Sequence, residues 1–151
     1  MQTFQSENQP GDVRLNKYIS DAGVCSRREA DRLITEGRVQ IDGKMATLGS
    51  RVVPGMQVCV DGKEIAPEEE MILLAVNKPR GIVCTTDTRW GDRTIYDLMN
   101  YPKRIFSIGR LDKESEGLLL MTNNGDILNK IMRAGNYHEK EYLVMIDTPV
   151  T

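Results

Sequence analysis

Three carboxylates stand close together in residues 109–117, whose sequence is Gly-Arg-Leu-Asp-Lys-Glu-Ser-Glu-Gly. A carboxylate can act as a nucleophile or as a general base, so Asp112 is a candidate for either kind of chemistry. Asp112 with Glu114 or Glu116 could also form the paired carboxylates of a hydrolase, although charges so close in sequence are more typical of a solvated loop. An aspartate in a loop is often only a turn former, and residue type alone favours that interpretation.

Apolar runs flank this polar loop on both sides. Residues 105–108 precede Gly109, and residues 118–121 follow Gly117 and end in the turn signal Asn-Asn-Gly at 123–125. This pattern predicts a strand, a polar loop, a second strand and a turn. Two buried strands would hold the loop in a rigid frame, which is where chemistry is often placed.

Further elements are expected around this centre. Residues 71–76 form a continuous apolar run, which predicts a buried strand, and residues 94–99 could form a short helix. Asp126 is expected to cap a helix that residues 134–136 close. The apolar face of that helix would carry Ile127, Leu128, Ile131 and Met132. A further strand is expected at 138–144.

The first 65 residues predict two short helices and several short strands. Apolar residues within 13–22 have helical spacing, and Gly23 closes that helix. Ser26 and Glu29 form the pattern of a capping box, in which the Ser hydroxyl caps the helix and the Glu reaches back to the Ser amide. Alternating residues at 39–41 and 58–60 predict strands.

Composition limits the classes of function. The chain has 151 residues, enough for one ordinary domain or two small ones, and no apolar run approaches the ~20 residues that span a bilayer. Three widely spaced cysteines and a single histidine make a zinc site or a disulfide scaffold unexpected. We expect these cysteines to be reduced thiols, which is typical of cytoplasmic proteins. With a net charge of −2, any binding of nucleic acid must come from local basic clusters.

Three motifs resemble those of pseudouridine synthases of the RsuA/RluA superfamily. The central one is Gly109-Arg110-Leu111-Asp112, followed by Gly117-Leu118-Leu119-Leu120 and Thr122-Asn123-Asn124-Gly125-Asp126. The family's first motif resembles Asn77-Lys78-Pro79-Arg80-Gly81, and the motif that supplies an active-site tyrosine resembles Lys140-Glu141-Tyr142. Residues 133–144 look most like the RluF type, which acts on large-subunit ribosomal RNA.

This resemblance implies isomerisation of a uridine to pseudouridine in ribosomal RNA, most of all 23S RNA, with no metal or cofactor. It makes Asp112 the catalytic carboxylate, as a nucleophile or as a base at the ribose. Tyr142 would offer a ring to the uracil and a hydroxyl for proton transfer. Arg110 would hold the flipped nucleotide or fill the gap that it leaves. His138 is not expected to be a general base, because the family uses no histidine there.

Residues 13–65 resemble the S4 RNA-binding domain. The match runs through Arg14-Leu15-Asn16-Lys17-Tyr18-Ile19, Ala22-Gly23, Ser26-Arg27-Arg28-Glu29-Ala30-Asp31, and Gly37-Arg38-Val39 with Asp42-Gly43. Without the resemblance, these cations would be interpreted as a solvated surface balanced by acids. With it, Arg27 and Arg28 at a helix start become phosphate contacts. The full set of predicted RNA contacts is Arg14, Lys17, Arg27, Arg28, Arg32, Arg38, Lys44, Lys78, Arg80, Arg110 and Lys140.

Residues 89–93, Arg-Trp-Gly-Asp-Arg, form a second basic loop. A tryptophan beside cations suits stacking on RNA bases, but Trp90 could equally anchor the loop to the core. The sequence leaves these two interpretations open.

The expected fold class is α+β. We expect a disordered tail at 1–12, a small αL-like S4 domain at 13–65, an acidic linker at 66–70 and the N-terminal part of a mixed-sheet catalytic domain at 71–151. Because catalytic domains of this family continue well beyond such a point, we expect a truncated chain whose incomplete sheet could pair with a second copy. A non-catalytic S4-type RNA-binding protein, or an inactive synthase fragment, is the alternative function.

Overall fold

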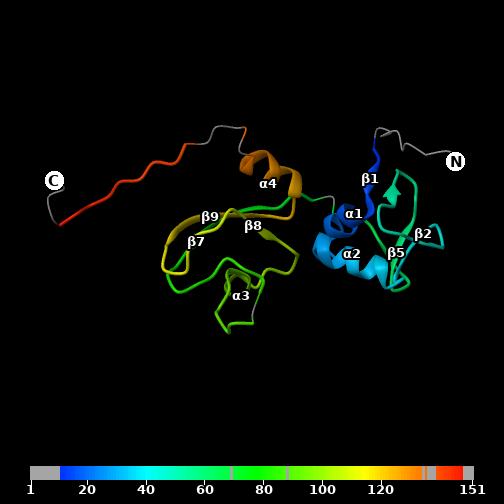
Figure 1. Ribbon diagram of the computed structural model, residues 1–151, viewed down its shortest axis with the longest axis horizontal. Coiled ribbons are helices and arrows are strands. Elements are labelled where there is room, and N and C mark those ends of the chain that lie inside the picture. Colours follow the sequence, from blue (N-terminus) through cyan, green and yellow to red (C-terminus); the bar gives the residue numbers. More distant parts are fainter. Residues whose placement is uncertain (1–10, 69, 88, 134, 136–138, 148–151) are drawn as a thin grey trace.

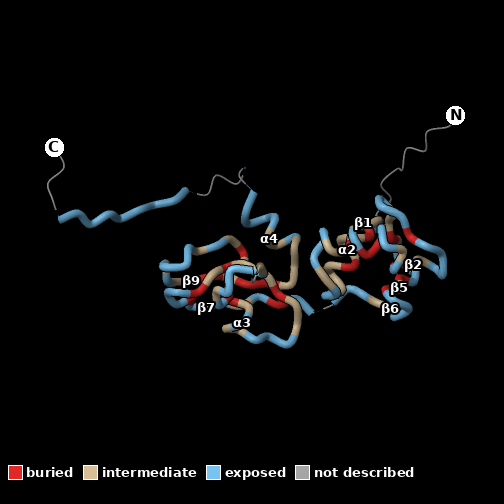
Figure 2. The backbone as a smooth tube through the Cα atoms, turned by 60° about the horizontal axis from the view of Figure 1, so that its bottom comes forward, coloured by how far each residue is buried: buried red, intermediate tan, exposed pale blue. Residues whose placement is uncertain are grey.

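The computed structural model describes residues 11–68, 70–87, 89–133, 135 and 139–147. Helices and strands in these ranges form two units that lie side by side (Figure 1). The architecture is the expected mixture of helices and sheets. Each unit has its own buried centre, which appears as separate red segments in Figure 2.

The first unit contains two helices and six short strands. Its elements are β1 (Val13–Arg14), α1 (Leu15–Asp21), α2 (Arg27–Thr35), β2 (Val39–Ile41), β3 (Lys44–Met45), β4 (Arg51–Val52), β5 (Val58–Val60) and β6 (Lys63–Ile65). The two predicted helices are confirmed, although Val13 lies in a strand that pairs with Val52. The core of this unit brings Leu15 and Ile19 of α1 against Leu33 of α2 and Val39 and Val58 of the sheet.

The start of α2 shows half of the predicted capping box. The Ser26 Oγ accepts a hydrogen bond from the Glu29 amide at 3.2 Å. The Glu29 carboxylate does not reach back, because it pairs with Arg32 one turn further along the helix. The helix is therefore capped by the serine, and the glutamate supports its exposed face instead.

The second unit is built on an antiparallel three-stranded sheet of order β7-β9-β8. Its elements are β7 (Leu73–Lys78), α3 (Ile95–Met99), β8 (Phe106–Ile108), β9 (Gly117–Thr122) and α4 (Gly125–Met132). The predicted strands at 105–108 and 118–121 and the helix at 94–99 are confirmed. Val76 faces Leu119 in the register, and both belong to a core that also contains Ile95 of α3.

Strand β7 forms where a buried strand was predicted, but only one of its faces is buried. Burial alternates along it, and Leu73 is 51% exposed. On the neighbouring β9, Leu118 is 70% exposed. The core that contains Ile95 of α3 covers one face of the sheet. Successive side chains of a strand point to opposite faces, so every second side chain of β7 remains uncovered.

Two details around α4 differ from the prediction. Asn124, not Asp126, is the N-cap: its Oδ1 accepts from the amides of Asp126 at 2.9 Å and Ile127 at 3.2 Å. Asn124 has the extended backbone that a cap requires, whereas Asp126 is already helical. The helix ends at Met132, before the predicted 134–136, and Met132 on its apolar face is exposed.

The strand expected at 138–144 is wrong for the residues that the structure describes. Residues 139–147 run in extended form away from the sheet (Figure 1), and no ladder pairs them. A strand needs a hydrogen-bonded neighbour, and this segment lies beside none. His138 lies outside the described residues.

Candidate active site and RNA interface

The polar loop 109–116 leaves β8 and returns as β9, so both of its ends are fixed by one antiparallel ladder. Gly109 at φ 77° and Gly117 at φ 136° take left-handed backbone at the two ends, which other residues adopt only with strain. Leu111 packs against the core of the second unit. The Ser115 amide donates to the Asp112 carbonyl at 3.1 Å, which closes a turn.

Asp112 itself is exposed. Among the described residues, its carboxylate makes no hydrogen bond or ion pair. A neighbouring apolar side chain and a backbone turn thus hold this residue from below while its oxygens face solvent. The arrangement leaves the carboxylate free to meet a bound molecule.

Lys78 is the most deeply buried charged residue of the described chain, with no exposed surface. Its Nζ donates to three backbone carbonyls, those of Ser115 at 2.6 Å, Pro79 at 2.9 Å and Lys113 at 3.3 Å. Two of these carbonyls belong to the first and third residues after Asp112. The ammonium therefore holds the loop in place, because three charge-assisted hydrogen bonds are what a buried ammonium requires.

Two neighbouring loops join this one through Lys113. The Gly81 amide donates to the Lys113 carbonyl at 2.7 Å, and the Lys113 Nζ lies 2.8 Å from Asp92 Oδ1. The hydrogen bond from Lys113 to Asp92 raises the pKa of the lysine. Loops 79–81, 89–93 and 109–116 consequently meet at one end of the sheet, around Asp112.

The part of the chain that the structure describes contains no cluster of three or more His, Cys, Asp or Glu side chains that could hold a metal ion. It also contains no helix with the length and apolar character needed to cross a bilayer. The loop of the candidate site carries the exposed cation Arg110 and the exposed acids Glu114 and Glu116 beside Asp112.

Comparison of the sequence with models of known protein families shows which families its two units match. Residues 72–151, more than half of the chain, match the model of the RNA pseudouridylate synthases, and residues 13–58 match that of the S4 domain. The chain belongs to the RNA pseudouridylate synthase family. The first unit is therefore called the S4 unit below, and the second the synthase unit.

Several relatives in this family are close in sequence. The chain is 58% identical over 142 residues to the dual-specificity RNA pseudouridine synthase RluF of Escherichia coli, covering 92% of this chain and 48% of that protein. It is 40% identical over 142 residues to an uncharacterised RNA pseudouridine synthase of Mycobacterium leprae, covering 90% of this chain and 56% of the relative. The chain spans about half the length of these relatives.

The other predicted residues of the synthase unit have different surroundings. Arg110 and Arg80 are exposed beside the Asp112 loop, and Arg80 lies 3.6 Å from Glu116. Lys78, predicted to contact RNA, is instead wholly buried beneath that loop, so the prediction is corrected: its charge is used by backbone carbonyls and cannot reach a phosphate.

Tyr142 and Lys140 lie on the extended segment 139–147. Both are exposed, Tyr142 by 77%. The segment leads away from the sheet in Figure 1, and no ladder joins it to β7, β8 or β9. Its apolar residues 142–146 are all exposed, as expected of a segment that packs on nothing.

The predicted cations of the S4 unit divide into paired and open ones. Arg38 binds Asp61 through two nitrogens, at 2.8 and 2.6 Å, which raises the pKa of the guanidinium. Arg32 pairs with Glu29 and Glu36. Within the described ranges, no carboxylate lies in salt-bridge distance of the other four, Arg14, Arg27, Arg28 and Lys44. All four of these side chains are exposed.

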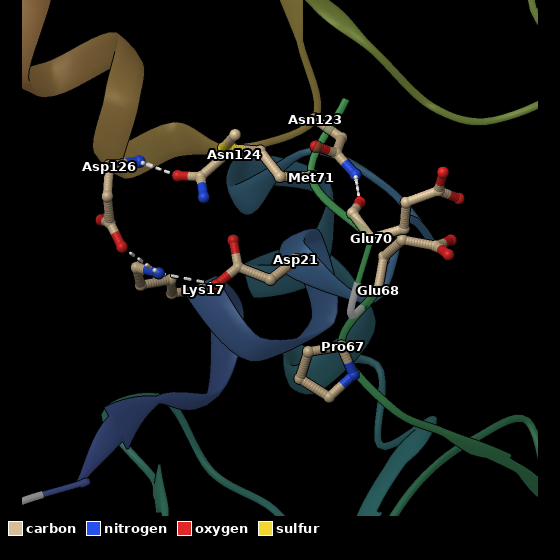
Figure 3. Close-up of a pocket in the computed structure, with 9 residues that line it drawn as sticks. All are labelled: Lys17, Asp21, Pro67, Glu68, Glu70, Met71, Asn123, Asn124 and Asp126. Atoms are coloured by element: carbon tan, nitrogen blue, oxygen red, sulfur yellow. Dashed lines mark hydrogen bonds and ion pairs between the residues drawn. The ribbon is translucent and has the colours of Figure 1, made fainter. Parts of the chain in front are cut away.

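Lys17, the remaining predicted RNA contact, instead joins the two units. Its Nζ lies 2.6 Å from Asp21 Oδ2 on α1 and 3.3 Å from Asp126 Oδ2 on α4 (Figure 3). Burial opposes its charge, but the hydrogen bonds and charges of these two acids outweigh burial and raise the pKa of Lys17. Glu68 and Glu70 line the same pocket between the units. The Lys17 ammonium is thus paired with one carboxylate from each unit, and this pocket is a junction between them.

Sequence reasoning missed the residues that arrange the site. Asp92 and its pair with Lys113 gave no signal, because the two residues are 21 positions apart. Thr94 and Asp97 form a complete capping box at α3, and that signal was visible as Thr-x-x-Asp. The buried state of Lys78 had no local signal, because its three carbonyl partners come mostly from a distant loop.

Proposed function

We propose that this chain is the S4-containing part of an RNA pseudouridine synthase that converts a uridine of 23S ribosomal RNA, with Asp112 as the catalytic carboxylate. The observation that carries this proposal is the exposed Asp112 on a loop held from below by Lys78. A carboxylate that is positioned by its backbone, and not occupied by a partner, suits attack on a bound nucleotide.

The reaction is an isomerisation. The bond between uracil N1 and the ribose C1′ breaks, the base turns, and a bond forms between C5 and C1′. The proton of C5 is lost and N1 gains one, so atoms balance without an oxidant or a cofactor. Asp112 acts either by forming a transient bond to the sugar or by removing a ribose proton. Tyr142 is proposed to contact the uracil when segment 139–147 packs toward the loop.

RNA binding is proposed for both units. The open cations Arg14, Arg27, Arg28 and Lys44 of the S4 unit would bind phosphates, and Arg80 and Arg110 would hold the nucleotides around the target. The base must leave its stack to meet Asp112, and the exposed Arg110 is proposed to support it. Because ribosomal RNA is the proposed substrate, the cytoplasm is the proposed location.

The domain division proposed from the sequence is kept as residues 13–65, 66–70 and 71–151. The two separate cores support it, the first reaching Ile65 and the second beginning at Ile72. The linker is tied to the synthase unit, because the Asn123 Nδ2 donates to the Glu70 carbonyl at 2.8 Å. Lys103 of the synthase unit also pairs with Glu68 and Glu70 of the linker.

Self-association through the three-stranded sheet is also proposed. Strands β7 and β8 are its outer strands, and Leu73 and Leu118 present apolar surface on the face away from α3. Edges and faces of this kind pair readily with a second chain. Sedimentation of the wild type and of Leu118→Lys over a range of concentrations tests this proposal, because the added charge would keep the chain monomeric.

A non-catalytic RNA-binding protein remains the second candidate function, because the segment 139–147 that carries the exposed Tyr142 leads away from the sheet (Figure 1). The experiment that separates the two incubates the chain with 23S RNA and maps pseudouridine along it. Since the Escherichia coli relative is named dual-specificity, a second substrate pool of small RNAs is included. Product at a defined uridine supports the enzyme; tight binding with no product in either pool supports the second candidate.

A further inference from the structure

Trp90 is the only tryptophan of the chain and is 84% exposed. The sequence left two roles open for it, anchoring its loop to the core or stacking on a base. An anchoring tryptophan buries most of its ring, because the ring is the largest apolar side chain available. The observed exposure removes the anchoring role and leaves a large aromatic surface facing solvent.

The loop that carries Trp90 is braced by its own side chains. The Asp87 amide donates to Thr85 Oγ1 at 3.0 Å, and the Arg89 amide donates to Asp87 Oδ1 at 3.1 Å. The Arg89 guanidinium also binds the Asp87 carboxylate and holds the pKa of Asp87 down at about 2. The residue before Trp90 is therefore already held by Asp87, so that less order has to be imposed when a ligand binds.

The far side of the same loop is fastened to the candidate active site. Asp92 Oδ1 lies 2.8 Å from the Nζ of Lys113, the residue after Asp112. The Arg93 carbonyl accepts from the Val83 amide at 3.1 Å, which secures the next residue. Trp90 and Asp92 are two positions apart with Gly91 between them, which is at most ~7 Å of backbone. The ring is thus held within a few nucleotides of a base bound at Asp112.

The charges around the ring suit a nucleic acid strand. Arg93 and Arg110 are exposed on two of the three loops that meet there, and Arg80 on the third is exposed beside Glu116. Cations that follow a sugar–phosphate backbone, together with an aromatic ring that accepts a base, form the usual platform for unpaired nucleotides. When the target uridine leaves the RNA helix, each neighbouring base loses its stacking partner on one side.

We propose that Trp90 stacks on a nucleobase next to the target uridine and so fixes the register of the RNA over Asp112. This inference rests on the proposed function. It assigns the ring to an unpaired base of the RNA, rather than to a protein partner.

Tryptophan fluorescence tests the proposal directly, because the emission of the chain comes from this one side chain. The chain is titrated with a fragment of 23S RNA that contains the modified uridine, and binding is followed in parallel by the anisotropy of labelled RNA. We expect the emission to be quenched with the same midpoint as the anisotropy change. Binding with unchanged emission would overturn the role of Trp90 alone; absence of any binding would overturn the proposed function with it.

Variants give a second, independent measure. Trp90→Leu is expected to weaken RNA binding about 10-fold, because stacking on one base is lost, whereas Trp90→Phe keeps most of the affinity. Tyr101→Leu, a partly exposed aromatic on another loop of the synthase unit, is the matched control and should bind as the wild type does. Equal affinity of Trp90→Leu and the wild type would contradict the proposal.

Discussion

The ammonium of Lys78 lies 2.6 Å from the carbonyl oxygen of Ser115, three residues beyond Asp112. Lys78 ends strand β7, and Ser115 belongs to the loop that enters β9, so the contact joins two of the family's motifs across the sheet. A cation beside a candidate catalytic aspartate would ordinarily be assigned to substrate binding. Its complete burial shows that this one positions the backbone around Asp112.

Replacing Lys78 by Met is expected to destabilise the synthase unit. Met fills a similar volume but leaves the carbonyls of Pro79 and Ser115 without the ammonium as donor, whereas the Lys113 carbonyl keeps its hydrogen bond from the Gly81 amide. Each carbonyl that loses its partner costs about 1–3 kcal/mol, so a loss of about 2–6 kcal/mol in the free energy of unfolding is expected. Urea denaturation followed by circular dichroism measures it.

The matched control for this variant is Lys63→Met, on the exposed strand β6. It removes the same charge where no buried group depends on it and should change the free energy of unfolding by less than about 0.5 kcal/mol. Equal stability of the Lys78→Met variant and this control would show that the ammonium is not needed to hold the loop.

The open and paired arginines of the S4 unit should differ in their contribution to RNA binding. Arg28 is exposed and available to a phosphate, whereas both edges of Arg38 are engaged by Asp61 and Glu36. Arg28→Gln is therefore expected to weaken binding and to lower the slope of log affinity against log salt concentration by about 1. Arg38→Gln should leave that slope nearly unchanged.

Filter binding of 23S RNA fragments between low and moderate salt measures both slopes. The two substitutions remove the same charge from the same unit, so each serves as the control for the other. If Arg38→Gln lowered the slope as much as Arg28→Gln, the ion pair with Asp61 would have to open for RNA, and the division into paired and open cations would be wrong.

The capping box of α3 gives a prediction about acid stability. The Thr94 amide donates to the Asp97 carboxylate at 2.9 Å, and this backbone hydrogen bond and that of the Thr94 hydroxyl lower the pKa of Asp97. A carboxyl group with a lowered folded-state pKa stabilises the fold above its unfolded value of 3.8. The stability that Asp97 contributes should disappear as the pH falls from 3.8 through the lower pKa that Asp97 has in the folded state.

Thr94→Ala, which removes the cap, is expected to cost about 1 kcal/mol at neutral pH. Thermal unfolding of the wild type and of Asp97→Asn between pH 7 and pH 2 tests the acid effect. The difference between their melting temperatures should shrink as the pH falls below about 4. A difference that stayed constant over this range would mean that the Asp97 charge does not support the cap.

Local patterns in the sequence predicted most elements of the fold. The helical spacing of residues 13–22, the Ser26 cap and the apolar runs beside the 109–116 loop all depend on neighbours along the chain, and these elements are present. Where two polar residues compete for one position, pattern is less informative. Asn124 takes the cap expected of Asp126, because either side chain can accept the amide bonds and backbone geometry decides between them.

Predictions that depend on distant contacts fared differently. The motifs placed Asp112 in an exposed loop between two strands, as found. They did not reveal that Lys78 faces carbonyls 35 and 37 residues away, or that Lys17 is shared between Asp21 and Asp126. For a lysine, sequence gives the charge, whereas partners and burial decide whether that charge is available to RNA.

The measurement that tests the central claim most directly compares Asp112→Asn with Glu114→Gln. Both change a carboxylate to an amide within the same exposed loop, two residues apart. RNA labelled with tritium at C5 of uridine releases the label when C5 bonds to the ribose, so release reports the isomerisation itself.

Binding of the same RNA is measured alongside for each variant. We expect Asp112→Asn to release no tritium above background while binding RNA as the wild type does, and Glu114→Gln to retain at least about half of the wild-type rate, because its carboxylate has no assigned role. Wild-type release by Asp112→Asn would contradict the assignment of Asp112 as the catalytic carboxylate.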